Sequence, residues 1–458
     1  MSTSNSDTTA SVSRTGSDPA ATTSTIPTLP GAWPLLGHLK DIRYRLPEWA
    51  HENHKKHGPV FRADLGFGAN CIFIEGVDSL SILNNRTTSS ADIAARSEPM
   101  LGSHAMIVLD GKAHRKSRGA ISKSFSPGGL DRAEVLRTTE GVFASHVSDW
   151  AQPGELNLHI ATRDAVFDAI CRVAGVKPGE LSQWRSRFRM LLLGSMGTPE
   201  DIPGSPAWIA KLGRKWLDKR LLAEIHRIRA EGDESCLLGS MVHARDEDGA
   251  HATDEALLDN LRLLVLAGHE TTASTIGWAM LYLAREPKLW QRLVDEAASS
   301  PDADITSFDG LSAFPFAEAL FRESVRFYPP ITMETRTVEQ ELSFHGVTIA
   351  PGEVVASAIA NVSRDPSLFD NAEVFDPERW LGEGRRTPSK AETCQFGGGP
   401  HFCLGYHLAV AEATQCLVNV ARQFTAKGLS LESTGPLPKL RYYPLLALPG
   451  NAKLRVVG

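Results

Sequence analysis

A ten-residue string near the C-terminus, from Phe396 to Gly405, constrains this chain most. It contains three consecutive glycines, a proline and a single cysteine, Cys403. Glycines let the backbone fold tightly around one atom and approach a flat group without Cβ clashes. An apolar helical pattern follows from Leu404 to Leu417, so the sulfur would lie at a helix start, where the dipole favours a thiolate. Although a lone cysteine is more often a small buried apolar side chain, this string predicts a protected thiolate.

Composition excludes several other kinds of protein. The chain has 458 residues with 42% hydrophobic content, enough for a large core, and a net charge of −6. Basic residues are nowhere dense enough to follow a row of phosphates, so we expect no nucleic-acid partner. Six cysteines without paired spacing indicate a reducing compartment, and we expect a cytoplasmic protein. The sequence has no apolar run of the length that a membrane span needs.

The chain divides into a short polar tail and a long folded body. Residues 1–28 are rich in Ser and Thr and have few large apolar side chains, so we predict a disordered tail there. Residues 29–458 form the predicted body, in which helical periodicity predominates and strand patterns occur at 60–65, 71–74 and 342–349. This order of elements predicts a mainly α fold with a minor β region.

The longest apolar helical stretch, residues 257–283, contains an unusual group of small and hydroxyl residues. Ala267, Gly268 and Thr271 share one face of the expected helix. A glycine inside a helix costs about 1 kcal/mol, so a purely structural helix has little reason for it. A threonine can bond the carbonyl one turn back and open the helical ladder, which leaves room for a small molecule. The alternative is a kinked core helix with Glu270 in an ion pair.

Three motifs of this chain resemble those of one family. The C-terminal string resembles the cysteine-ligand signature of cytochrome P450, the haem-thiolate oxygenase family, through Phe396, Gly397, Gly399, His401, Cys403 and Gly405. His401 departs from the pattern, because most of the family has arginine there. The oxygen-side helix motif of the family is matched by Ala267, Gly268, Glu270, Thr271 and Thr272. Its buried charge triad is matched by Glu323, Arg326 and Arg379, and the resemblance covers nearly the whole chain from about Leu29.

The resemblance implies a single large domain of the cytochrome P450 fold that binds haem b, with the Cys403 thiolate as the iron ligand. Ala267 and Gly268 would lie against the haem. Thr271 would hydrogen-bond the oxygen substrate, and Glu270 would help relay protons to it. The triad would lock the loop that carries the ligand.

Further residues are implied to hold the edge of the cofactor. Haem propionates need cations, and the resemblance assigns them to His114, Arg118, Arg336 and His401. Phe396 and Gly405 would flank the ligand. An ordinary solvated basic helix face is the alternative for His114 and Arg118, and it also stays open for Arg336.

The resemblance also implies a reaction and its partners. We expect one oxygen atom from O2 to enter a lipophilic small molecule, by hydroxylation or epoxidation, in natural-product tailoring. Leu263, Ala267, Ile331 and Thr332 would line the substrate pocket, and residues 184–208 would form a mobile lid. Electrons would come from a separate ferredoxin or flavodoxin with its reductase, because the chain has no flavin or iron–sulfur module. We expect a monomer.

Two alternative functions stay open at this point. The first is a peroxide-using or rearranging enzyme on the same fold, which needs no reductant, although the intact Glu270–Thr271 pair argues against it. The second is a haem-binding sensor or carrier without catalysis. Turnover with peroxide alone would indicate the first, and a Thr271→Ala variant with unchanged oxygen consumption would indicate the second.

Overall fold

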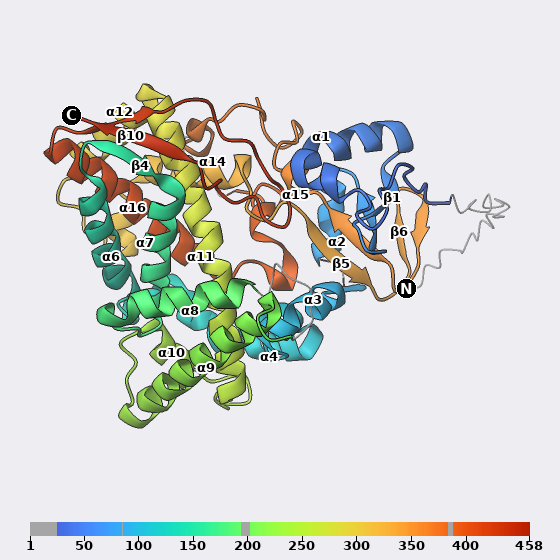
Figure 1. Ribbon diagram of the computed structural model, residues 1–458, viewed down its shortest axis with the longest axis horizontal. Coiled ribbons are helices and arrows are strands. Elements are labelled where there is room, and N and C mark those ends of the chain that lie inside the picture. Colours follow the sequence, from blue (N-terminus) through green and yellow to red (C-terminus); the bar gives the residue numbers. More distant parts are fainter. Residues whose placement is uncertain (1–24, 85, 194–201, 383–387) are drawn as a thin grey trace, which may run out of the picture.

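One long helix, α11 (Asp254–Arg285), runs through the middle of the computed structural model and organises the elements around it (Figure 1). The structure describes residues 25–84, 86–193, 202–382 and 388–458. The α11 helix starts at Thr253, whose side chain accepts a hydrogen bond from the Ala256 backbone. It ends just before Pro287, because the residue that precedes a proline is disfavoured in the helical conformation.

Most of the other helices of the described chain pack around α11 or near it (Figure 1). The bounds of these and the remaining helices are α1 Leu39–His57, α2 Ser81–Asn84, α3 Ala91–Leu101, α4 Gly111–Ser122, α5 Pro127–Arg132, α6 Val135–Trp150, α7 Leu158–Val173, α8 Leu181–Leu193, α9 Pro206–Glu231, α10 Leu237–His243, α12 Pro287–Ser299, α13 Phe308–Leu311, α14 Pro315–Phe327, α15 Ile359–Val362 and α16 Tyr406–Ala426. Three of them, α1, α2 and α15, lie beside the main sheet (Figure 1).

The strands form a minor part of the molecule, as predicted. Their bounds are β1 Val60–Asp64, β2 Asn70–Ile74, β3 Thr88–Ser89, β4 Gly154–Asn157, β5 Glu334–Val338, β6 Leu342–Phe344, β7 Val347–Ile349, β8 Val354–Ser357, β9 Ser430–Ser433 and β10 Lys453–Val457.

The largest sheet has the strand order β1-β2-β8-β5-β3 and lies beside α1, on the far side of the molecule from α6 and α7 (Figure 1). The predicted hairpin is present, with β1 and β2 antiparallel and Val60 opposite Ile74. β2 then pairs in parallel with β8. The pattern at 342–349 folds into the small hairpin of β6 and β7. The mainly α fold with a minor β region is therefore confirmed.

Backbone hydrogen bonds join residues 27–29 to β1. The backbone N–H of Arg62 donates to Pro27 at 2.8 Å, and that of Leu29 donates to Arg62 at 2.9 Å. These bonds add residues 27–29 to the exposed edge of β1, a pairing that the polar composition of this segment does not predict. Residues 1–24 of the predicted tail lie outside the described residues.

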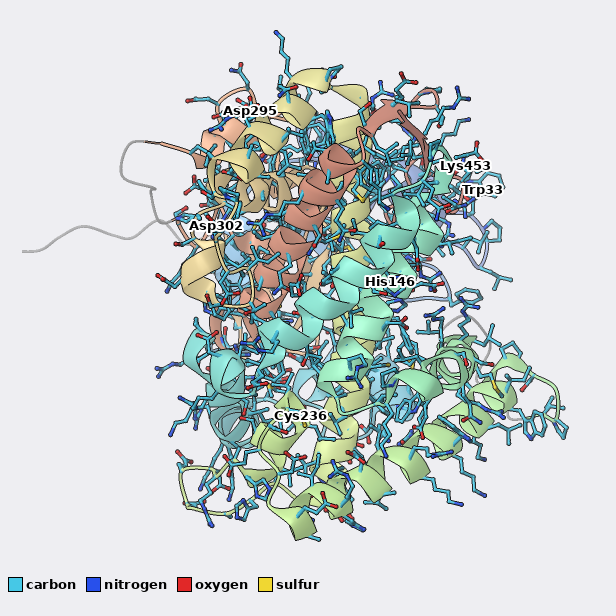
Figure 2. The ribbon with its side chains drawn as sticks, turned by 90° about the vertical axis from the view of Figure 1, so that its left-hand side faces the viewer. Trp33, His146, Cys236, Asp295, Asp302 and Lys453 are labelled. Carbon is cyan, nitrogen blue, oxygen red and sulfur yellow. The ribbon has the colours of Figure 1, made fainter. Side chains whose placement is uncertain are left out.

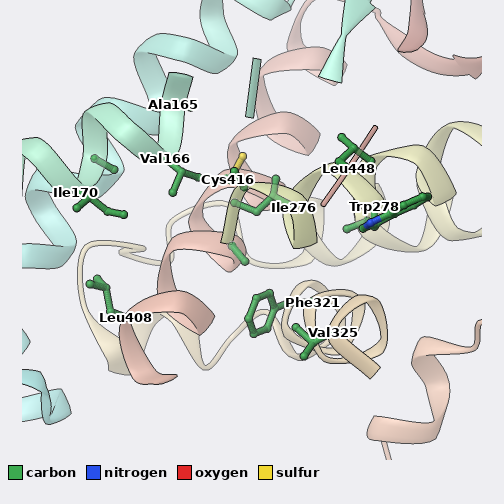
Figure 3. Packing of buried hydrophobic residues seen from close by; sticks show 14 of the residues in the cluster. Ala165, Val166, Ile170, Ile276, Trp278, Phe321, Val325, Leu408, Cys416 and Leu448 are labelled. Atoms are coloured by element: carbon green, nitrogen blue, oxygen red, sulfur yellow. The ribbon is translucent and has the colours of Figure 1, made fainter. Parts of the chain in front are cut away.

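The apolar core is built around the C-terminal half of α11. Figure 3 shows Ile276 and Trp278 of α11 between side chains of α7, such as Val166, and side chains of α14, such as Phe321. Trp278 stacks on Tyr328 with ring centroids 3.9 Å apart. None of the helices in the described part of the chain combines the length and apolar character that a membrane crossing requires.

Candidate functional site

The cysteine loop takes its shape in part from two glycines in the left-handed backbone conformation. Gly397 and Gly399 have positive φ angles of 76° and 57°, which favour glycine. A Cβ atom on Gly399 would lie 2.5 Å from the carbonyl oxygen of Leu83, so this loop packs directly against the end of α2. The backbone N–H of Cys403 donates to the Phe396 carbonyl at 2.7 Å and closes the loop just before α16.

The Cys403 side chain is partly buried, at the cavity wall and beside Arg118. Burial raises the pKa of its thiol, whereas the Gly405 backbone N–H and the Arg118 guanidinium oppose that rise. Arg118 also donates to the Phe402 carbonyl at 2.7 Å, which ties α4 to the cysteine loop. The loop thus supplies the groups that stabilise a negative sulfur, as a metal-bound thiolate requires.

Across the cavity from this loop, α11 is a continuous helix from Asp254 to Arg285, without the opening in its hydrogen-bond ladder that the sequence predicts. The Thr271 hydroxyl donates to the Ala267 carbonyl at 2.6 Å. A Cβ atom on Gly268 would lie 3.0 Å from Cδ1 of Ile170, so the glycine also allows α7 to approach α11 closely. Gly268 therefore has a packing role as well as the predicted functional one.

Both features face a single cavity of about 1210 Å³ of empty space, including the solvent at its mouth. Its wall contains the predicted residues His114, Arg118, Leu263, Ala267, Gly268, Thr271, Arg336, His401, Cys403 and Gly405. The structure therefore brings together four segments that lie far apart in sequence, namely α4, α11, β5 and the cysteine loop. Apolar side chains complete the wall, among them Ile93, Met106, Ile107, Ile121, Phe125, Ile170, Met241 and Leu264.

One edge of the cavity gathers basic side chains. The rings of His114 and His401 lie 4.1 Å apart, and His401 contacts Asp110 at 3.2 Å. His114 is buried, and its Nε2 has no hydrogen-bond partner among the described residues. Burial, together with His401 and Arg118, lowers its pKa to about 4. Buried polar atoms are normally paired, so this nitrogen indicates a ligand that supplies the partner.

Arg336 and its neighbour Glu334 complete this edge. Arg336 is buried, donates to the Thr335 carbonyl at 3.0 Å and lies 3.6 Å from Glu334. Burial raises the pKa of Glu334, and Arg336 opposes that rise. The wide cavity, the glycine cradle around one sulfur and the basic edge together suit haem, a flat cofactor with two carboxylate groups.

The predicted triad lies outside the cavity and is complete. Arg326 and Glu323 are fully buried and form a bidentate pair at 2.7 and 2.8 Å. Arg379 donates to Glu323 at 3.1 Å. The remaining donors of Arg326 reach the carbonyls of Ser363, Ala372 and Val374. The triad therefore fixes the segment from 363 to 379 that precedes the cysteine loop.

Glu270 is not among the cavity residues. Its carboxylate forms an ion pair with Arg163 of α7, the arrangement that the sequence left open as an alternative. His269 lies 3.8 Å from Glu270, and its Nε2 lies 3.0 Å from the Arg163 carbonyl. The acid thus belongs to a contact between α7 and α11 in this structure.

Three other predicted residues lie away from the cavity. The Thr332 hydroxyl donates to the Tyr442 carbonyl at 2.8 Å, and the Pro330 carbonyl accepts from Leu446. These bonds hold Ile331 and Thr332 against the C-terminal segment, so neither lines the cavity described here. The Phe396 ring packs between Phe321 and Tyr406, and only its backbone supports Cys403.

The expected lid contributes to the core. Trp184, Phe188 and Leu191 of α8 are buried, and Phe188 contacts Phe167 and His269. Aromatic residues at helical spacing in a sequence do not reveal whether they face a core or a pocket. Residues 194–201 of this segment lie outside the described residues.

Sequence reasoning missed two acidic residues of the cavity wall, Glu334 and Glu412. Glu412 of α16 is buried, and its Oε1 has no partner in the described chain. Burial raises its pKa to about 8, which favours the neutral acid at pH 7. Its position nine residues after Cys403 within an apolar helix was the available signal.

Comparisons with known proteins agree with this geometry. The family model of cytochrome P450 matches residues 217–455. The cytochrome P450 BJ-4 homolog of Sinorhizobium fredii is 34% identical over 92% of this chain and 93% of that protein. The cyclooctat-9-en-7-ol 5-monooxygenase of Streptomyces melanosporofaciens is 26% identical over 87% of this chain and 88% of its own length.

A solved structure gives the same fold. The cyanobacterial CYP120A1, in a structure titled as bound to retinoic acid, superposes with a TM-score of 0.80 at 24% sequence identity. The superposition covers 95% of this chain and all of the other. With the glycine-rich cysteine loop, the Thr271–Ala267 bond of α11 and a basic edge around one cavity, and with these relatives, the chain belongs to the cytochrome P450 family of haem monooxygenases.

Proposed function

We propose that this chain inserts one oxygen atom from O2 into an apolar small molecule, by hydroxylation or epoxidation. The observation that carries the proposal is the single cavity with Cys403 in one wall and the Thr271–Ala267 hydrogen bond in another. When bound, the haem of this family supplies oxygen activation, and the protein supplies the ligand, orientation and electrostatics.

Residues of the cavity would hold haem b in a defined orientation. Of the six cysteines, Cys403 is the one in the described cavity wall, and its thiolate would be the axial ligand. The propionates would meet His114, Arg118, Arg336 and His401, where the unpaired Nε2 of His114 would find its partner. Arginine suits this task because its planar guanidinium matches a carboxylate.

Thr271 and Glu270 would manage protons on the oxygen side. The Thr271 hydroxyl lies at the cavity wall, where it can turn from the Ala267 carbonyl toward an oxygen atom. Glu270 would relay protons only when its carboxylate leaves Arg163 or exchanges protons through water near that pair. Arg163 thus determines how readily the acid reaches the cavity.

The substrate proposal rests on the apolar wall. Leu263, Leu264, Met106, Ile107 and Met241 offer contacts that fit a lipophilic molecule. Tailoring of a natural product is our leading proposal, and the relative named as cyclooctat-9-en-7-ol 5-monooxygenase supports it. A screen for ligands that shift the haem absorption spectrum would identify the class.

Electrons would come from a separate redox chain of ferredoxin or flavodoxin type. Arg115 and Lys123 are exposed near the cysteine loop and could meet an acidic partner. Lys116 contacts Asp246 and Asp248 instead. We therefore expect charge reversal at Arg115 or Lys123 to reduce the salt dependence of electron transfer. The same change at Lys116 should have a smaller effect.

The Thr271→Ala variant tests the proposed reaction. We expect it to bind haem and consume reducing equivalents, but to release peroxide in place of much of the oxygenated product. Product yield per electron would then fall about 100-fold or more, in the range of a lost acid–base function. If coupling and peroxide release equal those of the wild type, or if product forms with peroxide but never with reductant and O2, the proposal is wrong.

A further inference from the structure

Four large apolar side chains stay exposed on two neighbouring loop tips beside the main sheet. Trp33, Leu35 and Leu36 belong to the tip at residues 33–37, and Phe67 belongs to the β1–β2 turn at residues 65–69. We call these two segments the double tip. The exposed fractions reach 74% for Leu35 and 78% for Phe67, and Figure 2 shows Trp33 at the margin of the molecule.

Hydrogen bonds join the two tips into one rigid protrusion. The Phe67 N–H donates to the Leu35 carbonyl at 2.6 Å. Trp33 and Gly37 exchange backbone hydrogen bonds at 2.8 and 2.9 Å. A Cβ atom on Gly37 would lie 2.4 Å from the Asp64 carbonyl oxygen, so the first tip packs closely against β1. The apolar side chains are therefore held outward by a fixed backbone.

The backbone at the two most exposed positions does not suit their side chains. Leu35 and Phe67 have φ angles of 64° and 54°. Glycine and asparagine adopt this left-handed conformation most readily, whereas leucine and phenylalanine are strained in it. Neither stability nor solubility explains such residues at the ends of exposed loops, so their apolar side chains indicate a contact with another surface.

The size and shape of the double tip argue against a protein partner. The four side chains expose on the order of 500 Å², taking roughly 150–250 Å² for each fully exposed large side chain. A stable protein interface buries about 800 Å² on each partner. The segment 1–24 has only Met1 and Val12 as large apolar residues, so its composition offers few apolar partners for the tips.

The charge beside the tips favours a lipid surface. The amino group of Lys40 lies 5.3 Å from the centre of the Trp33 ring, and no described carboxylate lies within ion-pair distance of it. Tryptophan favours the interface between membrane and water, and a nearby lysine can meet an anionic headgroup. A convex apolar protrusion enters a deformable lipid layer more easily than a preformed protein groove.

We propose that the double tip inserts its apolar side chains into an anionic lipid surface and holds the enzyme there. Trp33, Leu35, Leu36 and Phe67 would enter the headgroup region, and Lys40 would contact lipid phosphate. Such a contact would place the enzyme where lipophilic molecules concentrate. The proposal does not depend on which substrate is oxidised.

The test measures how the full-length holoprotein binds vesicles of mixed phosphatidylcholine and phosphatidylglycerol in a flotation assay. The double variant Leu35→Asn/Phe67→Asn removes the apolar side chains and keeps residues that tolerate the left-handed backbone. We expect its apparent affinity to fall about tenfold or more, with an unfolding temperature equal to or above that of the wild type. The Phe67→Gly variant should show part of the same loss.

Two further variants identify the source of any binding. Ile160→Asn removes another exposed apolar side chain, on α7, and should leave binding unchanged. Lys40→Gln should weaken binding about fivefold with phosphatidylglycerol present and have no effect on pure phosphatidylcholine. The proposal is overturned if the double variant binds like the wild type, or if the wild type binds neither vesicle. A wild-type dimer that the double variant converts to a monomer would also overturn it.

Discussion

Arg326 in the triad has five N–H donors, and each has an acceptor inside the protein. His114, at the edge of the cavity, is also buried, yet its Nε2 has no partner among the described residues. Both sites hold basic side chains that the resemblance assigned to haem function. The difference indicates that the triad is a structural lock, whereas the cavity edge is a binding site for a group that brings its own acceptors.

The largest expected effect on stability comes from disrupting the buried triad. Glu323→Gln would leave the fully buried Arg326 without its counter-charge, so the free energy of unfolding should fall by about 3 to 5 kcal/mol. The haem should also be lost more readily, because Arg326 and Arg379 fix the segment before the cysteine loop. Denaturant unfolding, followed by circular dichroism and haem absorbance together, measures both effects.

Glu378→Gln is the matched control for this change. Glu378 lies next to Arg379 in sequence but pairs with Arg292 at 3.5 Å on the surface. An exposed pair of this kind is worth at most about 1 kcal/mol. If both variants lose the same stability, the triad is not the lock described above.

A second prediction concerns His269, a buried histidine whose Nε2 has a hydrogen-bond partner, whereas its Nδ1 has none among the described residues. His269 donates toward the Arg163 carbonyl, and burial, together with Arg163, lowers its pKa to about 3. His269→Leu should cost about 1 to 3 kcal/mol at pH 7, since it leaves that carbonyl unpaired. The unfolded chain binds a proton to His269 below about pH 6.5, but the folded chain does not.

The stability from a neutral His269 is therefore present above pH 6.5 and declines as the pH falls toward 3. The difference in unfolding free energy between wild type and His269→Leu should shrink over this range. Urea unfolding at several pH values measures it. A difference that stays constant with pH would show that His269 does not titrate as a buried neutral group.

The same substitution at the cavity edge should act differently. His114→Leu removes a ring that has an unpaired nitrogen, so the unfolding free energy of the haem-free protein should change by less than about 1 kcal/mol. Haem should nevertheless transfer to apomyoglobin about tenfold faster, because a propionate loses its donor. If stability falls as it does for His269→Leu while haem release is unchanged, His114 is a structural residue.

The smallest expected effects distinguish Leu263, which lines the cavity, from Thr332, which the sequence placed in the pocket but which lies outside it. Thr332→Val should lower stability by about 1 kcal/mol, through loss of the bond to Tyr442, and leave ligand affinity unchanged. Leu263→Phe should change the affinity of apolar ligands, measured by their haem spectral shift, because Leu263 lines the cavity. If Thr332→Val changes the affinity of these ligands, residues 331–332 do contact the substrate and the assignment above is wrong.

The sequence predicted best those features of the fold and the site that are determined by residues close together in the chain. The cysteine loop was predictable because glycine geometry and helix start lie within ten residues. The triad was predictable through the resemblance, although Glu323 and Arg379 meet only in the fold. The hairpin of β1 and β2 and the helix α11 followed from periodicity alone.

Residues that depend on distant partners were predicted less well. The pairing of Glu270 with Arg163 joins α7 to α11, and nothing in the helix motif indicates it. Ile331 and Thr332 follow the triad helix closely, yet bonds to the C-terminal segment determine where they lie. The buried Glu412 reached the cavity wall by the same kind of tertiary packing.

The ferrous carbon-monoxide absorption spectrum tests the central claim most directly, namely that the Cys403 thiolate binds the haem iron in this cavity. The wild type, and the control Cys394→Ser, whose cysteine is buried away from the cavity, should show the strongly red-shifted band of a thiolate-bound haem. Cys403→Ser should fold with an unchanged circular dichroism spectrum and lack that band. A red-shifted band retained in Cys403→Ser would contradict the account.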